Sequence, residues 1–340
     1  MAGPRPAAAI VGVAGPELTA EEERLFRRRR PLGLILFKRN IDTPAQVFDL
    51  TAAFRRAVGA EDAPVLIDQE GGRVARLRPP HWRHPPPAAS FAALAARSPA
   101  LARRAAFLNA RLMADDLASL GIDVDCAPVL DLPVPGAHDV IGDRAHGDTP
   151  RLAASLGRAV AKGLLAGGVV PVMKHIPGHG RATADSHESL PVVTAALREL
   201  MARDAKPFKA LSNTCPWAMT AHVVYTALDA ERPATLSPAA IRFIRREIGF
   251  QGLLVSDDLS MKALAGEPGS LAAAAIKAGC DVVLECPGEI ARTEAVLRAV
   301  PELSPTAARR LKAAAREAAS AFVPRFDRAR AEATLAALLA

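Results

Sequence analysis

The stretch VVPVMKHIPGHG, residues 169–180, determines how we interpret the rest of the chain. Its first five residues form an apolar run of the kind found in a buried strand. Lys174 and His175 follow directly, so such a strand would carry them at its C-terminal end. A loop with two glycines and a proline then brings Asp185 and His187 back over that end. Buried cations are costly unless they are paired, and functional residues often lie on loops. This composition therefore indicates a functional site.

Strand-like runs and helical patterns alternate along the whole chain. Such alternation is expected of a (β/α)8 barrel, an α/β fold with a parallel sheet. A length of 340 residues, half of them apolar, is ordinary for one barrel. We predict a single-domain (β/α)8 TIM-type barrel over residues 1–340, with extra C-terminal helices. The predicted strands are Ala8–Val13, Leu32–Phe37, Pro64–Asp68, Ile122–Leu130, Val169–His175, Trp217–Val223, Leu253–Ser256 and Asp281–Leu284. The predicted helices are Ala20–Arg29, Pro44–Val58, Leu101–Leu120, Pro150–Ala166, Thr194–Leu211, Pro238–Ile248 and Leu271–Ala278, then Glu289–Ala299, Thr306–Ala321 and Arg328–Leu339.

Polar and charged residues gather where five of the predicted strands end. In barrels of this type, active sites lie at the C-terminal ends of the strands. Each residue alone could be a salt-bridge or capping residue, and we expect Asp258 to be a helix N-cap. The set as a whole indicates a site. Its segments are Ile67–Arg76, Asp131 with Val140–Arg144, Lys174–His175, Thr220–His222 and Ser256–Asp258.

Four interpretations of the segment from Lys174 to His187 are open. The four are a solvated polar loop, a metal site, a Schiff-base site at Lys174 and an acid/base site. No H-E-x-x-H helix or Cys/His pairing supports zinc. The metal ligands would be His175, His179, Asp185 and His187.

We favour the acid/base interpretation. Asp185 and His187 are spaced i, i+2, so in an extended segment both side chains would face the same way. A carboxylate bonded to one imidazole nitrogen fixes the tautomer and raises the pKa of the histidine. Such a histidine can donate and accept protons near neutral pH.

The charge and cysteine patterns argue against several classes of protein. The net charge is +7, but the basic residues are scattered and only 4% of residues are aromatic, which does not fit nucleic-acid binding. The dense run Arg27–Arg30 is expected at a helix end, where cations complement the macrodipole. Met1–Gly15 fits a first strand better than a signal peptide, and no apolar run could span a membrane. The four cysteines do not have the spacing of metal ligands, and this pattern indicates reduced thiols in a cytosolic protein. We expect a cytoplasmic protein that binds neither nucleic acid nor membranes, as a monomer or weak homo-oligomer.

With Asp257 at the end of the seventh strand, the chain resembles the bacterial β-N-acetylhexosaminidases of glycoside hydrolase family 3. The resemblance is to the single-domain cytoplasmic type used in peptidoglycan recycling. The K-H-x-P-G-H-G motif with a downstream D-S-H is the specific signal, whereas D-Q-E-G-G alone is weaker. The matching segments cover most of the barrel in the family's order: Ile67–Leu77, Ala127–Leu132, Val140–Arg144, Lys174–Gly180, Asp185–Pro191, Met219–Val223 and Val255–Met261.

The resemblance implies a retaining mechanism through a covalent glycosyl-aspartate intermediate. In it Asp257 is the nucleophile, His187 the general acid/base and Asp185 its partner. The implied reaction removes non-reducing terminal N-acetylglucosamine (GlcNAc) from GlcNAc-1,6-anhydro-N-acetylmuramic acid, with or without a peptide stem. No metal or organic cofactor is implied. The residues implied to hold the sugar are Asp68, Arg76, Arg144, Lys174 and His175.

Two positions depart from the usual family pattern. Ile176 replaces a common phenylalanine, and His146 stands where an aromatic residue is frequent, which would affect a detail of the sugar subsite. Two alternatives stay open. One is a family 3 β-glycosidase or phosphorylase of other sugar preference, because a histidine acid/base tolerates a phosphate nucleophile better than a carboxylate would. The other is a non-catalytic sugar-binding barrel, which would have no use for Asp257 or the D-S-H loop.

Overall fold

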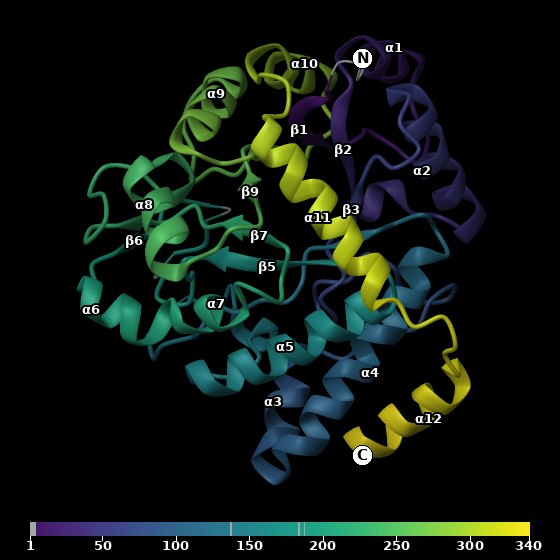
Figure 1. The fold of residues 1–340 in the computed structure, drawn as a ribbon, viewed down its shortest axis with the longest axis vertical. Coiled ribbons are helices and arrows are strands. Elements are labelled where there is room, and N and C mark those ends of the chain that lie inside the picture. The colour runs from purple at the N-terminus through teal and green to yellow at the C-terminus, as the bar shows by residue number, and fades with distance from the viewer. Residues whose placement is uncertain (1–4, 137, 183, 187) are drawn as a thin grey trace.

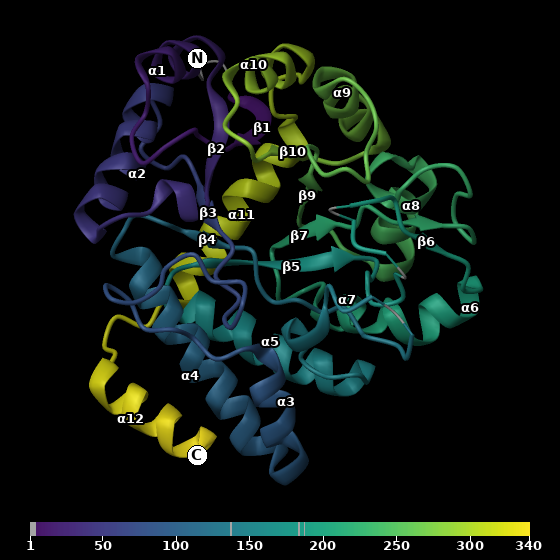
Figure 2. The same cartoon turned by 180° about the vertical axis from the view of Figure 1, so that it is seen from behind.

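The computed structural model describes residues 5–136, 138–182, 184–186 and 188–340. In this part of the chain, eight parallel strands close into a barrel surrounded by helices, which confirms the predicted (β/α)8 fold (Figure 1, and from behind in Figure 2). Around the ring the strands are β1 (Ala7–Val11), β2 (Pro31–Leu36), β3 (Val65–Ile67), β4 (Val124–Asp125), β5 (Val170–Ile176), β7 (Trp217–Thr220), β9 (Leu253–Asp258) and β10 (Val282–Glu285), which pairs with β1.

Alternate residues of the strands pack on the two sides of the barrel wall. In β1, Ile10 belongs to the apolar cluster inside the barrel, whereas Ala9 and Val11 pack with the surrounding helices. Both sides are buried, which is why these strands have nearly continuous apolar sequences. Fully burying a side chain such as Ile10 contributes about 1.5–3 kcal/mol.

The helices begin and end at recognisable signals. The first begins after Thr19, which forms a capping box with Glu22. It ends at Arg29, with Arg30 in the left-handed region, so the basic run lies at a helix end as predicted. The helices are α1 (Ala20–Arg29), α2 (Pro44–Val58), α3 (Ala88–Arg97), α4 (Pro99–Ala118), α5 (Pro150–Ala166), α6 (Leu197–Glu199), α7 (Lys206–Leu211), α8 (Pro238–Phe243), α9 (Pro268–Ala278), α10 (Ile290–Ala299), α11 (Pro305–Ala321) and α12 (Arg328–Leu339).

The C-terminal helices are present as predicted, and α11 covers one end of the barrel. Its residues Ala307, Ala314 and Ala318 join the apolar cluster of the barrel interior, on the side where the strands begin. Figure 1 shows α11 crossing the barrel. The interior is therefore closed at this end, and the opposite end is left for a site.

Strand β4 is much shorter than the predicted Ile122–Leu130. Its ladder stops at Asp125, and a parallel bridge to Lys174 reappears only at Val129. Pro128 lies between them and has no N–H to donate to a ladder. Its carbonyl still accepts a hydrogen bond from Lys174 N at 3.1 Å, so the segment continues alongside β5.

Other elements were not predicted. The predicted helix Thr194–Leu211 is broken into α6, a π-helical turn over Leu200–Asp204 and α7. The helix α3 has no predicted counterpart. A small second sheet pairs β6 (Val192–Val193) with β8 (Val224–Tyr225). Within the described ranges, no helix has the length and apolar character needed to cross a bilayer. All four cysteines are buried free thiols.

Candidate active site

A cavity of about 250 Å³ lies at the C-terminal ends of the strands. Six of the eight predicted site residues line it, while His187 lies outside the described residues. The six are Asp68, Arg76, Arg144, Lys174, His175 and Asp257. The apolar part of the lining is formed by Ile35, Phe37, Val74, Met219, Met261 and Leu284.

The charged side chains on one part of the lining form a connected network. Lys174 Nζ lies 2.7 Å from Asp68 Oδ1 and 2.7 Å from Glu70 Oε1. Arg76 Nη2 donates to Asp68 Oδ2 at 2.9 Å. Two nitrogens of Arg144 donate to the two oxygens of Glu70, both at 2.8 Å. Glu70 was missed as a site residue, although it lies two positions after Asp68 in the D-Q-E-G-G motif.

The network keeps Asp68 and Lys174 charged at neutral pH. Burial alone would raise the pKa of Asp68, but the charges of Lys174 and Arg76 outweigh it and hold that pKa well below its usual range. Burial would lower the pKa of Lys174, but Asp68 and Glu70 raise it well above its usual value. A Schiff-base lysine must lose its proton before it attacks. This environment therefore argues against the Schiff-base interpretation and makes Lys174 a hydrogen-bond donor.

We expect Glu70→Gln to destabilise the protein by about 3 kcal/mol at pH 7. Against the opposing effect of burial, Arg144 and Lys174 lower the pKa of Glu70 from 4.5 to about 2. A carboxylate with a lowered folded-state pKa contributes its full stability above the unfolded-state pKa and loses it as the pH falls. The difference from wild type should therefore persist above pH 4.5 and shrink between pH 4.5 and 2. Urea unfolding at several pH values measures it, and a difference that grows on acidification would contradict the assignment.

A second set of side-chain contacts, through His175, connects strand β5 to the end of β9. Asp131 Oδ2 lies 2.6 Å from His175 Nδ1, and Asp131 also accepts the backbone N–H groups of His175 and His179. The other ring nitrogen, His175 Nε2, lies 4.0 Å from Asp257 Oδ2. Burial would raise the pKa of Asp257, but His175 and His222 lower it below its usual value. Asp257 is therefore an ionised carboxylate in the cavity wall, as a nucleophile has to be.

Asp258 is not the helix N-cap that we expected. It is the last residue of β9, and the next regular helix, α9, begins only at Pro268. Its carboxylate accepts the backbone N–H groups of Ser260 and Cys286, and its carbonyl oxygen accepts from His222 Nε2 at 2.8 Å. These contacts hold the end of β9 in place. The backbone N–H of Asp258 also donates to Asp257 Oδ1 at 2.8 Å. Asp258 thus fixes the position of its neighbour.

The described residues around Asp185 are joined by backbone hydrogen bonds. The carbonyl oxygen of Asp185 accepts hydrogen bonds from the backbone N–H groups of both Glu188 and Ser189, each at 2.9 Å. His187, which precedes Glu188 in the sequence, lies outside the described residues. The predicted pairing of Asp185 with His187 therefore stays a prediction.

The metal interpretation finds no support among the described residues, where no group of three or more potential ligands is placed to hold an ion. One ring nitrogen of each of two proposed ligands is already engaged: His175 Nδ1 contacts Asp131, and His179 Nε2 contacts Ser186 Oγ at 3.1 Å. The fourth proposed ligand, His187, is outside the described residues.

His146 is not among the residues that line the 250 Å³ cavity, and its effect on the sugar subsite stays a prediction. It is 6% exposed, and its Nδ1 lies 2.9 Å from the carbonyl oxygen of Val129. With Glu70 and Arg144 it lines a small inner pocket behind the cavity. Burial lowers the pKa of His146, so it is a neutral residue that supports the network from behind.

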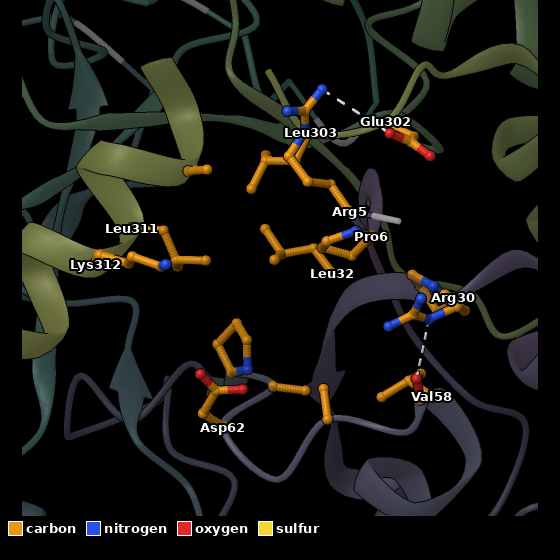
Figure 3. A pocket seen from close by; sticks show the side chains of 15 residues that line it. Arg5, Pro6, Arg30, Leu32, Val58, Asp62, Glu302, Leu303, Leu311 and Lys312 are labelled. Carbon is orange, nitrogen blue, oxygen red and sulfur yellow. Dashed lines mark hydrogen bonds and ion pairs between the residues drawn. The ribbon is translucent and has the colours of Figure 1, made fainter. Parts of the chain in front are cut away.

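A larger cavity, of about 590 Å³, lies at the opposite end of the barrel (Figure 3). Leu32 at the start of β2 and Leu311 of α11 contribute to its lining, and Arg5 pairs with Glu302 at its edge. Conserved chemistry in these barrels occurs at the other end, where the strands finish. The charged 250 Å³ cavity is therefore the candidate active site.

Comparison with known proteins agrees with this geometry. The model of the glycosyl hydrolase family 3 N terminal domain matches residues 11–320. A beta-hexosaminidase of Alkalilimnicola ehrlichii is 41% identical over 307 residues, covering 89% of this chain and 86% of that protein. A beta-hexosaminidase of Methylococcus capsulatus is 40% identical, covering 88% of this chain and 89% of that protein.

Solved structures show the same relationship. NagZ from Neisseria gonorrhoeae, in complex with N-trifluoroacetyl-D-glucosamine, superimposes with a TM-score of 0.88 at 30% identity and full coverage of both chains. A glycoside hydrolase family 3 β-N-acetylglucosaminidase from Paenibacillus sp. gives a TM-score of 0.84 at 31% identity, covering 97% of this chain. This chain spans 66% of that longer protein. The barrel, the residues at its strand ends and these relatives together show that the chain belongs to glycoside hydrolase family 3 and is a glycoside hydrolase.

Proposed function

We propose that this enzyme is a retaining exo-β-N-acetylglucosaminidase. Its substrate would be GlcNAc-1,6-anhydro-N-acetylmuramic acid, with or without a peptide stem, which the enzyme would cleave in the cytoplasm during peptidoglycan recycling. The observation that carries the proposal is the ionised carboxylate of Asp257 in the same cavity as the Lys174 network. The relatives named beta-hexosaminidase and the Neisseria protein with its bound glucosamine derivative support the choice of sugar.

The size and polarity of the cavity support action at a chain end. About 250 Å³ is just below the usual range of ligand pockets, about 300–1,000 Å³, and suits one sugar ring better than a longer glycan. Lys174, Arg76 and Arg144 have N–H groups to donate to sugar hydroxyls, and Asp68 can accept from a hydroxyl pair. A few oriented polar contacts of this kind are what a sugar site requires.

In the first step, a carboxylate oxygen of Asp257 attacks the anomeric carbon. The bond between that carbon and the glycosidic oxygen breaks, and His187 gives its proton to the departing oxygen. The product is a glycosyl ester on Asp257. His175, held by Asp131, keeps Asp257 ionised before the attack and faces it at 4.0 Å.

In the second step, His187 takes a proton from water and the water oxygen attacks the anomeric carbon. Asp257 leaves as a carboxylate, and two inversions give net retention. Most retaining glycosidases use a second carboxyl group as acid/base. Here that role falls to an imidazole, with Asp185 as the carboxylate that orients it, in the manner of a catalytic dyad.

The test is a turnover assay with aryl β-GlcNAc and with the anhydro-disaccharide, each with and without phosphate. We expect phosphate-independent release of GlcNAc, with the β-anomer formed first by NMR, and the same rate after treatment with a chelator. A rate that depends on phosphate and yields the sugar 1-phosphate would replace hydrolysis by phosphorolysis. Binding of GlcNAc without cleavage at any pH would favour the non-catalytic barrel.

A further inference from the structure

The loop after β5 is fixed firmly at its beginning. Tyr225 Oη donates to the carbonyl oxygen of Gly178 at 2.9 Å, and Arg181 Nε donates to Asp204 Oδ2 at 2.8 Å. Gly180 packs so closely that a Cβ there would lie 2.0 Å from the carbonyl oxygen of Leu132. These contacts precede Asp185, so they do not by themselves determine where the D-S-H residues lie.

Ser186 fixes the other part of the loop. It is 3% exposed, and its Oγ lies 3.1 Å from His179 Nε2. Its carbonyl oxygen accepts the backbone N–H of Ala263 at 3.1 Å. Ala263 follows β9, the strand that carries Asp257. Ser189, three residues further along the same loop, is exposed.

His179 is a rigid and uncharged partner for this serine. It is 2% exposed, its backbone N–H donates to Asp131 Oδ1 at 2.6 Å, and its ring packs edge-on against His175 with centroids 5.7 Å apart. Burial and the neighbouring His175 lower the pKa of His179 to about 4. At neutral pH it is therefore a neutral imidazole whose Nε2 forms one hydrogen bond with the Ser186 hydroxyl.

We propose that Ser186 and His179 form a latch that positions the acid/base loop beside the segment that follows β9. Ser186 is the middle residue of D-S-H, so the contact of its buried side chain with His179 limits the movement of the segment that carries the motif. The same residue ties the loop to the segment after Asp257. Ser186 is thus a positioning residue that fixes the loop of the acid/base relative to the strand of the nucleophile. This role rests on the proposed function.

The kinetic test compares Ser186→Ala with Ser186→Thr, which keeps the hydroxyl, and with Ser189→Ala as the matched control. We expect Ser186→Ala to lower kcat/KM for the disaccharide by about 10–100-fold, part of the effect of losing an acid/base. An aryl substrate with an acidic phenol should lose much less, because it needs little proton help. Ser186→Thr should recover most of the loss, and Ser189→Ala should match wild type. Equal losses on both substrates would overturn the proposal.

A second measurement reports on the latch without any turnover. The amide of Ala263 donates to the Ser186 carbonyl, so residue-resolved hydrogen exchange at Ala263 follows docking of the loop. Loss of one hydrogen bond should speed that exchange by about 3–10-fold in Ser186→Ala. His179→Ala should give a similar increase, and the double variant should be no worse than either single one because the two residues share one contact.

The two measurements separate the latch from the proposed function. If wild type cleaves no β-glycoside but Ser186→Ala still accelerates exchange at Ala263, the proposed function fails and the structural latch stands. If wild type is an active glycosidase and exchange at Ala263 is unchanged in both Ser186→Ala and His179→Ala, the latch is wrong while the function stands.

Discussion

Asp257→Ala is expected to lower kcat/KM for every β-GlcNAc substrate by a factor on the order of 10⁴–10⁶, whatever the leaving group. The loss should be so large because no described residue of the cavity can replace the missing nucleophile. Asp68 and Glu70 are engaged with Lys174. Asp258 is engaged with Ser260 and Cys286 in the turn after β9.

The measurements are steady-state rates and the intact mass of the protein after rapid quenching. Wild type should show a mass increase of one glycosyl group with a slow fluorinated substrate, and Asp257→Ala should show none. Azide added to Asp257→Ala should react by a single displacement and give the α-glycosyl azide. Asp257→Asn, which keeps the shape of the side chain, controls for a change in folding. A covalent glycosyl-enzyme formed by Asp257→Ala would refute the assignment.

Much of the barrel could be predicted because its strands are buried on both faces. β2 is apolar throughout, and β5 begins with an apolar run before Lys174. Such runs are visible in the local sequence. β4 could not be delimited in this way, because Pro128 interrupts the ladder inside the apolar run from Cys126 to Leu130. The helical pattern before Leu211 likewise concealed a π-helical turn, since apolar periodicity alone does not distinguish the two geometries.

The site was predictable where motifs end strands, and not where roles arise from pairing across the barrel. Asp68 and Lys174 follow apolar runs and could be identified from their positions. Glu70 and Asp131 matter because Lys174, Arg144 and His175 reach them from other parts of the barrel. Such distances are set by how neighbouring strands align in the barrel, which the local sequence does not encode.

His187→Ala should separate the two chemical steps. A substrate with a very acidic phenol leaves with little proton help, so its first step should be almost unaffected. Hydrolysis of the glycosyl-enzyme should slow, because water is no longer deprotonated. The intermediate should then accumulate, and stopped-flow absorbance should show a burst of phenol. The natural sugar is a poor leaving group that needs protonation, so its rate should fall by about 10²–10⁴-fold.

Azide provides the decisive readout for His187→Ala. It is a small anion that attacks without a general base, so it should restore turnover of the activated substrate and yield the β-glycosyl azide. His179→Ala is the matched control, because His179 is buried and its pKa of about 4 makes it a poor proton donor at neutral pH. It should loosen the loop without making turnover fully dependent on azide. If His187→Ala lost activity equally on both substrates, with no burst and no azide product, His187 would not be the acid/base. If His179→Ala then gave the burst and the β-glycosyl azide instead, the role would belong to His179 despite its burial.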